Sequence, residues 1–292
     1  MARSLVALAL AAALLPAAAP ARAAAPDGPC ASSRHPEAAN RLGARIVRAL
    51  RGRAGTESVA VYDRRRGIRC AVGAGRHYDS ASVVKVTVLG ALLRRAADEG
   101  RPLTAAERAR ARRMIVRSDN RATSALWRSL GRARVAEFLG LAGMARTELD
   151  PGGHWGLTQI TAGDEIELLE RLTSPSGLLP ARARAYALRL MHEVVPAQRW
   201  GTPAGRPAGV AWHVKNGWLP RPEGRWRVHS IGSFDGHGED YMIVVLTRDT
   251  PSMAYGVATI ERVARTVHRT LAGTSHPRPP GRPRDISDAP SA

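Results

Sequence analysis

Residues 82–93 read SVVKVTVLGALL, an apolar run that carries a single cation, Lys85. A helix that is apolar on nearly all sides is a buried helix, so this stretch predicts a helix inside the core. Burying a lysine is costly unless its charge is paired or its proton is lost. Ser82 lies three residues earlier on the same helical face, where the Lys85 amine can act as its base. The alternative is that Ser82 is an ordinary helix cap.

Lysine is rare in this chain. Of the 44 lysine and arginine residues, only Lys85 and Lys215 are lysines. Arginine stays protonated in proteins, whereas the pKa of a buried lysine shifts readily. The two lysines therefore predict positions where a movable proton or a compact charge is needed.

Outside this helix, some segments show the hydrophobic period of a helix, and others show the two-residue period of a strand. Strands are expected on both sides of a long helical block, so the two ends of the chain should build one sheet. The predicted fold class is α+β: a five-stranded antiparallel sheet flanked by terminal helices, with an inserted all-helical lobe. The expected segments are a helix over 36–51, strands over 58–63 and 68–72, helices through 82–195, strands over 212–215, 226–233 and 241–247, and a helix over 255–271.

The ends of the chain have a different composition from its centre. A basic start, an apolar run over 5–15 and small residues at 21–23 are typical of a secretory signal peptide. We expect a secreted monomer with no membrane attachment after signal cleavage. The expected parts are a signal peptide over 1–23, a flexible lead over 24–35, a sheet lobe over 36–81 and 200–275, a helical lobe over 82–199, together one domain, and a disordered tail over 276–292.

The two cysteines of the chain are Cys30 and Cys70. Asp27, Gly28 and Pro29 precede Cys30 and do not form the apolar and small approach that lipid attachment requires. In an oxidising compartment the two cysteines are expected to form a disulfide.

A formal net charge of +19 raises the question of nucleic acid. The arginines are scattered through every expected helix, without a stripe of interleaved aromatic residues, so we expect no nucleic-acid partner. A solvated basic surface outside the cell, attracted to anionic wall polymer, is the interpretation we favour. The sequence lacks a His-Glu-x-x-His motif and paired cysteines, and we expect no metal and no cofactor.

Two further motifs follow the Ser82 segment. Ser118, Asp119 and Asn120 lie on an expected turn between helices, where an ordinary polar cap is the alternative. Lys215, Asn216 and Gly217 lie on the first strand after the helical block, where the glycine lets a substrate backbone lie close. The alternative there is an edge-strand lysine followed by a turn.

In this order the three motifs resemble the active-site signature of the penicillin-recognising serine hydrolases, most closely the class A β-lactamase family. The resemblance spans 36–271 and includes the pair Leu149 and Asp150. It implies Ser82 as the acylated nucleophile, Lys85 as its base, and Ser118 as the proton relay to the leaving nitrogen.

The resemblance also implies the substrate-binding residues. Asn120 would hold the substrate side-chain amide, and Lys215 would attract the substrate carboxylate. The backbone N–H groups of Ser82 and Trp218 would form the oxyanion hole.

Two departures from the family pattern alter these expectations. Asn216 stands where the family carries Thr or Ser, although its amide can still donate a hydrogen bond. After Asp150 no acid occurs before Asp164, so the glutamate that activates the deacylating water is missing. Glu148 and His154 are the available substitutes. Because general-base assistance is worth about 10²- to 10⁴-fold, we expect slow deacylation and a long-lived acyl-enzyme.

The expected function is therefore a β-lactamase-like serine hydrolase acting on a small β-lactam or an acyl-D-Ala-D-Ala-like substrate. One alternative is a D-Ala-D-Ala peptidase or esterase that uses the same serine. Another is a non-catalytic wall-binding or β-lactam-sequestering protein. The sequence lacks a Gly-x-Ser-x-Gly elbow, which disfavours an α/β-hydrolase esterase.

Overall fold

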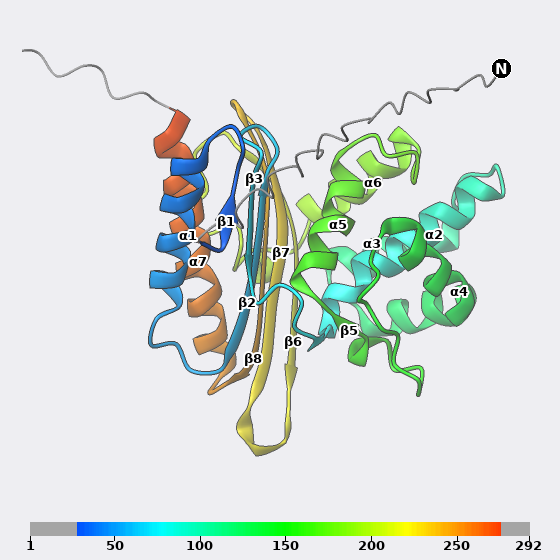
Figure 1. Ribbon diagram of the computed structural model, residues 1–292. Helices are drawn as coiled ribbons and strands as arrows, with labels where there is room; N and C mark the ends of the chain where they lie inside the picture. Colours follow the sequence, from blue (N-terminus) through cyan, green and yellow to red (C-terminus); the bar gives the residue numbers. More distant parts are fainter. Residues whose placement is uncertain (1–27, 276–292) are drawn as a thin grey trace, which may run out of the picture.

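A central sheet separates two groups of helices in the computed structural model, which describes residues 28–275 (Figure 1). The expected signal peptide over 1–23 and tail over 276–292 lie outside the described residues, as does the start of the expected lead. In Figure 1 the terminal helices cover one face of the sheet, and the helical lobe covers the other.

The sheet has six strands within the described residues, in the order β1-β3-β2-β8-β7-β6, and every pair is antiparallel. The five expected strands are confirmed, and the structure adds a short edge strand, β1. Its presence means that part of the expected flexible lead is instead paired in the sheet. The strands are β1 Cys30–Ala31, β2 Thr56–Asp63, β3 Ile68–Val72, β6 Ala211–Pro220, β7 Trp226–Gly236 and β8 Glu239–Thr250.

A disulfide joins Cys30 on β1 to Cys70 on β3, which confirms the expected pairing. The two residues lie opposite each other in the β1–β3 ladder. Both cysteines of the sequence are used in this bond.

The terminal helices α1 Pro36–Leu50 and α7 Met253–Ser275 bury their apolar sides against the sheet. Leu42 and Ile260 share one apolar cluster with Val59 and Val61 of β2. Ala60, between these valines, faces the opposite cluster with the helical lobe. The two-residue period of β2 thus serves both layers.

The helical lobe contains five α-helices among the described residues and one small exception to the all-helical expectation. Strand β4, Tyr78–Asp79, pairs with β5, Gln159–Ile160, and the two form a small sheet separate from the main one. The helices are α2 Lys85–Asp98, α3 Ala105–Val116, α4 Asn120–Ala142, α5 Ala162–Thr173 and α6 Ala181–His192, with 3-10 turns η1 Ala81–Val84, η2 Trp155–Leu157 and η3 Pro196–Gln198. A further 3-10 turn, η4 Pro222–Gly224, lies between β6 and β7 of the main sheet.

Helix α2 is the buried helix that the sequence predicts, since every residue over 85–93 is buried. It crosses α4 at Gly90. A Cβ at Gly90 would lie 2.3 Å from the Phe138 ring, so glycine is needed for this close approach. The tight crossing fixes the start of α2, which carries Lys85.

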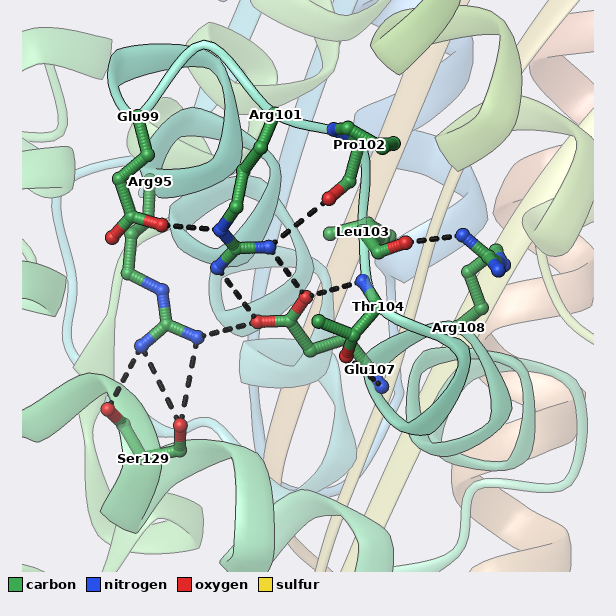
Figure 2. Close-up of polar contacts among 9 residues, drawn as sticks. All are labelled: Arg95, Glu99, Arg101, Pro102, Leu103, Thr104, Glu107, Arg108 and Ser129. Atoms are coloured by element: carbon green, nitrogen blue, oxygen red, sulfur yellow. Dashed lines mark hydrogen bonds and ion pairs between the residues drawn. The ribbon is translucent and has the colours of Figure 1, made fainter.

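The far end of α2 is joined to α3 by one carboxylate (Figure 2). Glu107 accepts hydrogen bonds from Arg95, Arg101 and the backbone N–H of Thr104. Thr104 in turn caps Glu107, which completes a capping box. Hydrogen bonding by Arg101, above all, lowers the pKa of Glu107 to about 2. Glu107 therefore stays ionised and ties the two helices together at neutral pH.

Glu165 on α5 is the opposite case, a carboxyl buried without a partner. It is fully buried, and neither of its side-chain oxygens has a hydrogen-bond partner within the described residues. Burial, followed by the charge of Asp164, raises the pKa of Glu165 from 4.5 to about 8. Folding therefore favours the protonated form.

This pKa predicts a loss of stability as pH rises. Between pH 4.5 and about 8 the unfolded chain gives up the Glu165 proton while the folded chain keeps it. The free energy of unfolding should then fall by up to about 1.4 kcal/mol per pH unit from this group. We expect Glu165→Gln to flatten this slope and to stabilise the protein above neutral pH. Urea unfolding of both proteins across this range measures the effect.

The matched control is Glu167→Gln, a partly exposed carboxyl on the same helix. It should leave the pH slope of the wild type unchanged. A Glu165→Gln variant that keeps the wild-type slope would contradict the assignment of the proton to Glu165.

Candidate active site

Ser82 lies in the 3-10 turn η1, directly before α2 begins at Lys85. The turn is held by hydrogen bonds from the backbone N–H of Ser80 to Thr158 and from that of Val83 to Ser80. Ala81 has φ of 47°, a left-handed conformation that is costly for a residue with a side chain. The backbone immediately before Ser82 is therefore strained.

Strand β6 runs directly past this turn because residue 217 is glycine. A Cβ at Gly217 would lie 2.9 Å from the backbone nitrogen of Ser82 and 3.0 Å from that of Val83. Both obstacles are backbone atoms and cannot move aside. Gly217 thus lets β6 pass close to the Ser82 and Val83 amides. That the N–H groups of Ser82 and Trp218 form an oxyanion hole stays a prediction.

The three motifs meet at one hydroxyl. Ser118 Oγ lies 3.0 Å from Lys85 Nζ and 3.0 Å from Lys215 Nζ. Lys85 also donates to the Ser118 carbonyl at 2.7 Å, and Lys215 donates to the Asn216 carbonyl at 2.8 Å. The Ser118 side chain thus joins Lys85 and Lys215, which lie 33 and 97 positions from it in the sequence.

Both lysines are fully buried. Burial lowers the pKa of Lys85 to about 7, although the charge of Asp119 opposes this shift. Burial also lowers the pKa of Lys215, and repulsion by Lys85 lowers it further. In the described structure neither amine has an ion pair with a carboxylate. Lys85 can therefore gain and lose a proton near neutral pH.

Ser118 reaches both amines from the turn between α3 and α4. Its φ of 56° is left-handed, so this turn is strained as well. Asp119 fixes the turn because its side chain accepts from the backbone N–H of Ala122 and caps α4. Two strained non-glycine residues, Ala81 and Ser118, thus lie at the site.

Asn120, the first residue of α4, is exposed, and its Oδ1 accepts from Lys85 at 2.8 Å. Its Nδ2 has no hydrogen-bond partner within the described residues. Its role in holding a substrate amide stays a prediction.

Asn216 differs from the expectation. The sequence predicts a substrate-binding residue whose amide can still donate a hydrogen bond, but Nδ2 donates to the backbone carbonyls of Gln198 and Trp200, both at 2.9 Å. The side chain is 1% exposed, and its Oδ1 has no partner among the described residues. Both N–H donors of Asn216 are therefore used inside the protein.

Trp155 is a site residue that the motifs did not indicate. Its ring lies 5.0 Å from Lys85 Nζ, and its Nε1 donates to Ser124 at 3.1 Å. Its carbonyl accepts from Ser80 in the strained turn. The position of Trp155 in the loop that lacks the family glutamate is the one sequence signal that points to it.

Neither proposed substitute for the missing base contacts the lysines. His154 is 72% exposed and is held by Asp150 at 2.9 Å. Glu148 is 71% exposed and lies 3.8 Å from His77. The side chain that contacts Lys85 is instead the Trp155 indole, which neither gains nor loses a proton at neutral pH.

Over residues 28–275 no group of three or more His, Cys, Asp or Glu side chains is arranged to hold a metal ion. Within the same range, no helix has the length and apolar character needed to cross a membrane.

The pKa of Lys85 can be measured directly because the chain has only two lysines. Protein labelled with ¹³C at lysine Cε should show two resonances, and that of Lys85 should titrate near pH 7. Asp119→Asn keeps the helix cap but removes the charge that raises this pKa, so the midpoint should move lower. Lys215→Arg assigns the two signals. A midpoint near 10.5 for Lys85 would contradict the effect of burial.

A family model described as "Beta-lactamase enzyme family" matches residues 108–271. This range contains Ser118, Asn120 and Lys215, and Ser82 and Lys85 precede it. A relative found by sequence is LppW of Mycobacterium tuberculosis and Mycobacterium bovis, a lipoprotein by name. It is 28% identical over 219 residues, which cover 73% of this chain and 69% of LppW.

Solved structures share the fold at low identity. A class A β-lactamase from Bacteroides cellulosilyticus is 18% identical with a TM-score of 0.71, over 80% of this chain and 98% of that one. TLA-1 extended spectrum β-lactamase is 18% identical with a TM-score of 0.72, over 80% and 98%. A point mutant of PBP-A, in an acyl-enzyme complex with penicillin G, is 21% identical with a TM-score of 0.70, over 80% and 97%.

These structures establish the fold, and the family model covers more than half of the 292 residues. The chain therefore belongs to the β-lactamase enzyme family and has the class A β-lactamase fold.

Proposed function

We propose that this protein is an exported serine hydrolase that opens a β-lactam amide through an acyl-enzyme on Ser82 and releases the product slowly. The observation that carries the proposal is the junction of Lys85, Ser118 and Lys215 at one hydroxyl, beside Ser82. Two buried amines with lowered pKa values around a shared hydroxyl form a route for a proton.

The acylation step follows from this arrangement. Neutral Lys85 takes the Ser82 proton, and Ser82 Oγ bonds to the lactam carbonyl carbon. The oxyanion that forms is bound by the backbone N–H groups of Ser82 and Trp218. As the C–N bond breaks, the Ser118 hydroxyl gives its proton to the leaving nitrogen and takes one from the Lys85 ammonium, to which it is already hydrogen bonded.

Lys85 must lose a proton before this step begins. Its three hydrogen bonds in the structure go to Ser118 and Asn120, and within the described residues the Ser82 hydroxyl has no hydrogen bond. These three bonds use all the donors of an ammonium. A neutral amine has a free lone pair and can accept the Ser82 proton, which a pKa of about 7 permits at neutral pH.

Slow release follows from the side chain beside Lys85. The Trp155 ring lies beside Lys85 and supplies no base. His154 and Glu148 are exposed and paired elsewhere. Without an activated water, deacylation loses about 10²- to 10⁴-fold. The acyl-enzyme should therefore accumulate.

The proposed substrate is a small molecule that has a reactive amide and a carboxylate. Lys215 supplies the cation, and Asn120 supplies a free amide N–H. The disulfide and the likeness to a lipoprotein by name support export, while the use of both cysteines in the disulfide supports free secretion. A D-Ala-D-Ala peptidase or esterase would use the same acylation step, so the leaving group distinguishes the two activities.

The first test is a time course of intact mass with benzylpenicillin. We expect one penicilloyl adduct per chain on Ser82, and a burst of hydrolysis equal to the enzyme concentration followed by slow turnover. Ser82→Ala should abolish the adduct. Ser80→Ala is the matched control, since Val83, not a lysine, lies three residues after it, and it should still be acylated. Turnover without a burst would refute slow deacylation, and no adduct at all would refute the function.

The second test places a carboxylate at the loop position beside Lys85. Trp155→Glu should shorten the lifetime of the acyl-enzyme about tenfold or more, because a carboxylate there can activate water. Trp155→Gln removes the same indole without adding a base and should leave the lifetime long. Equal lifetimes in the two variants would show that the missing base is not what limits release.

A further inference from the structure

A groove lined by four arginines lies between the two terminal helices. These helices cover the face of the sheet opposite the helical lobe (Figure 1). Its volume is about 520 Å³. Helices α1 and α7 run antiparallel along it, since Arg45 bonds to Thr270 while Arg53, further along, bonds to Thr259. The lining residues are Arg45, Arg48, Ala49, Arg262, Thr266, Arg269 and Thr270.

The charges of these helices are divided in a regular way. Each helix has one acidic residue, and each acid pairs with an arginine outside the groove: Glu37 with Arg41 on α1, and Glu261 with Arg265 on α7. Within residues 28–275, no carboxylate pairs with any of the four groove arginines. The groove therefore collects four uncompensated guanidinium groups.

The spacing of these arginines fits an extended ligand. Arg262 and Arg269 are seven residues apart, about two helical turns or roughly 10 Å, and lie on the same side of α7. Arg45 and Arg48 lie one turn apart on α1. A single phosphate cannot reach guanidinium groups along this length, whereas a chain of phosphates can contact them in succession.

The lining favours a phosphate polymer over single-stranded nucleic acid. The groove has only arginine, threonine and alanine, so it offers no aromatic ring on which nucleic-acid bases could stack. The threonine hydroxyls are turned to the backbone of their own helix, where Thr266 donates to Arg262 and Thr270 donates to Thr266. Guanidinium forks are left as the recognition groups, and they suit phosphate oxygens.

We propose that the groove between α1 and α7 binds a linear phosphate polymer, such as a polyol phosphate of a cell wall or inorganic polyphosphate. The site is separate from Ser82, because α1 and α7 cover the opposite face of the sheet. Polymer binding would hold the protein at an anionic surface while the catalytic face stays open to small substrates.

The test compares two double variants that lose the same charge. Arg48→Gln with Arg262→Gln removes two groove arginines. Arg128→Gln with Arg182→Gln removes two exposed arginines of the helical lobe that likewise have no ion pair within the described residues. Binding of fluorescent inorganic polyphosphate and of poly(glycerol phosphate) is measured by anisotropy at several salt concentrations. The acylation rate of Ser82 is measured on the same samples.

We expect the groove variant to bind about tenfold more weakly, with a plot of log affinity against log salt that is shallower by about 2. The helical-lobe variant should bind like the wild type, and both should keep the wild-type acylation rate. Binding by only one of the two polymers still supports the site and identifies its source of phosphate.

Three results would overturn the proposal. The wild type could fail to bind either polymer at physiological salt. The two variants could lose affinity equally, which would mean that net charge alone drives binding. Duplex DNA or anionic lipid vesicles could bind more tightly than both polymers and depend equally on the groove arginines, which would assign the groove to a different partner.

Discussion

The burial of two amines around the Ser118 hydroxyl is the constraint on which the site depends. An ammonium loses its hydration when it is buried, and neither Lys85 nor Lys215 recovers this cost through an ion pair with a carboxylate in the described structure. The cost is reduced if a proton leaves. The burial that makes this packing costly is therefore also what lowers the pKa values of the two amines.

Much of this site could be predicted from the sequence because its chemistry is concentrated in short local patterns. A lysine within an apolar helix, a polar turn between helices and a lysine followed closely by glycine are each visible over three or four residues. The structure places Lys85, Ser118, Lys215 and Gly217 together, as the resemblance implied. The two-residue period of apolar side chains likewise predicted the five main strands.

The rest depended on contacts between distant residues. The inward direction of Asn216 is set by carbonyls of Gln198 and Trp200, which precede it by 18 and 16 residues. Trp155 contacts Lys85 across 70 positions, and no local pattern of the loop encodes that contact. Strand β1 forms because Cys30 lies opposite Cys70, whereas its two residues are too few to show a period.

The burial of both lysines also determines how the surface reacts. All other cations of the chain are arginines or histidines, so the exterior of the folded protein displays no lysine amine. Reagents that couple to primary amines can then attach only at the chain's N-terminus or by entering beside Ser118. In this protein an ordinary amine-labelling reagent is, in effect, a probe of the site, because the folded surface supplies almost nothing else for it to modify.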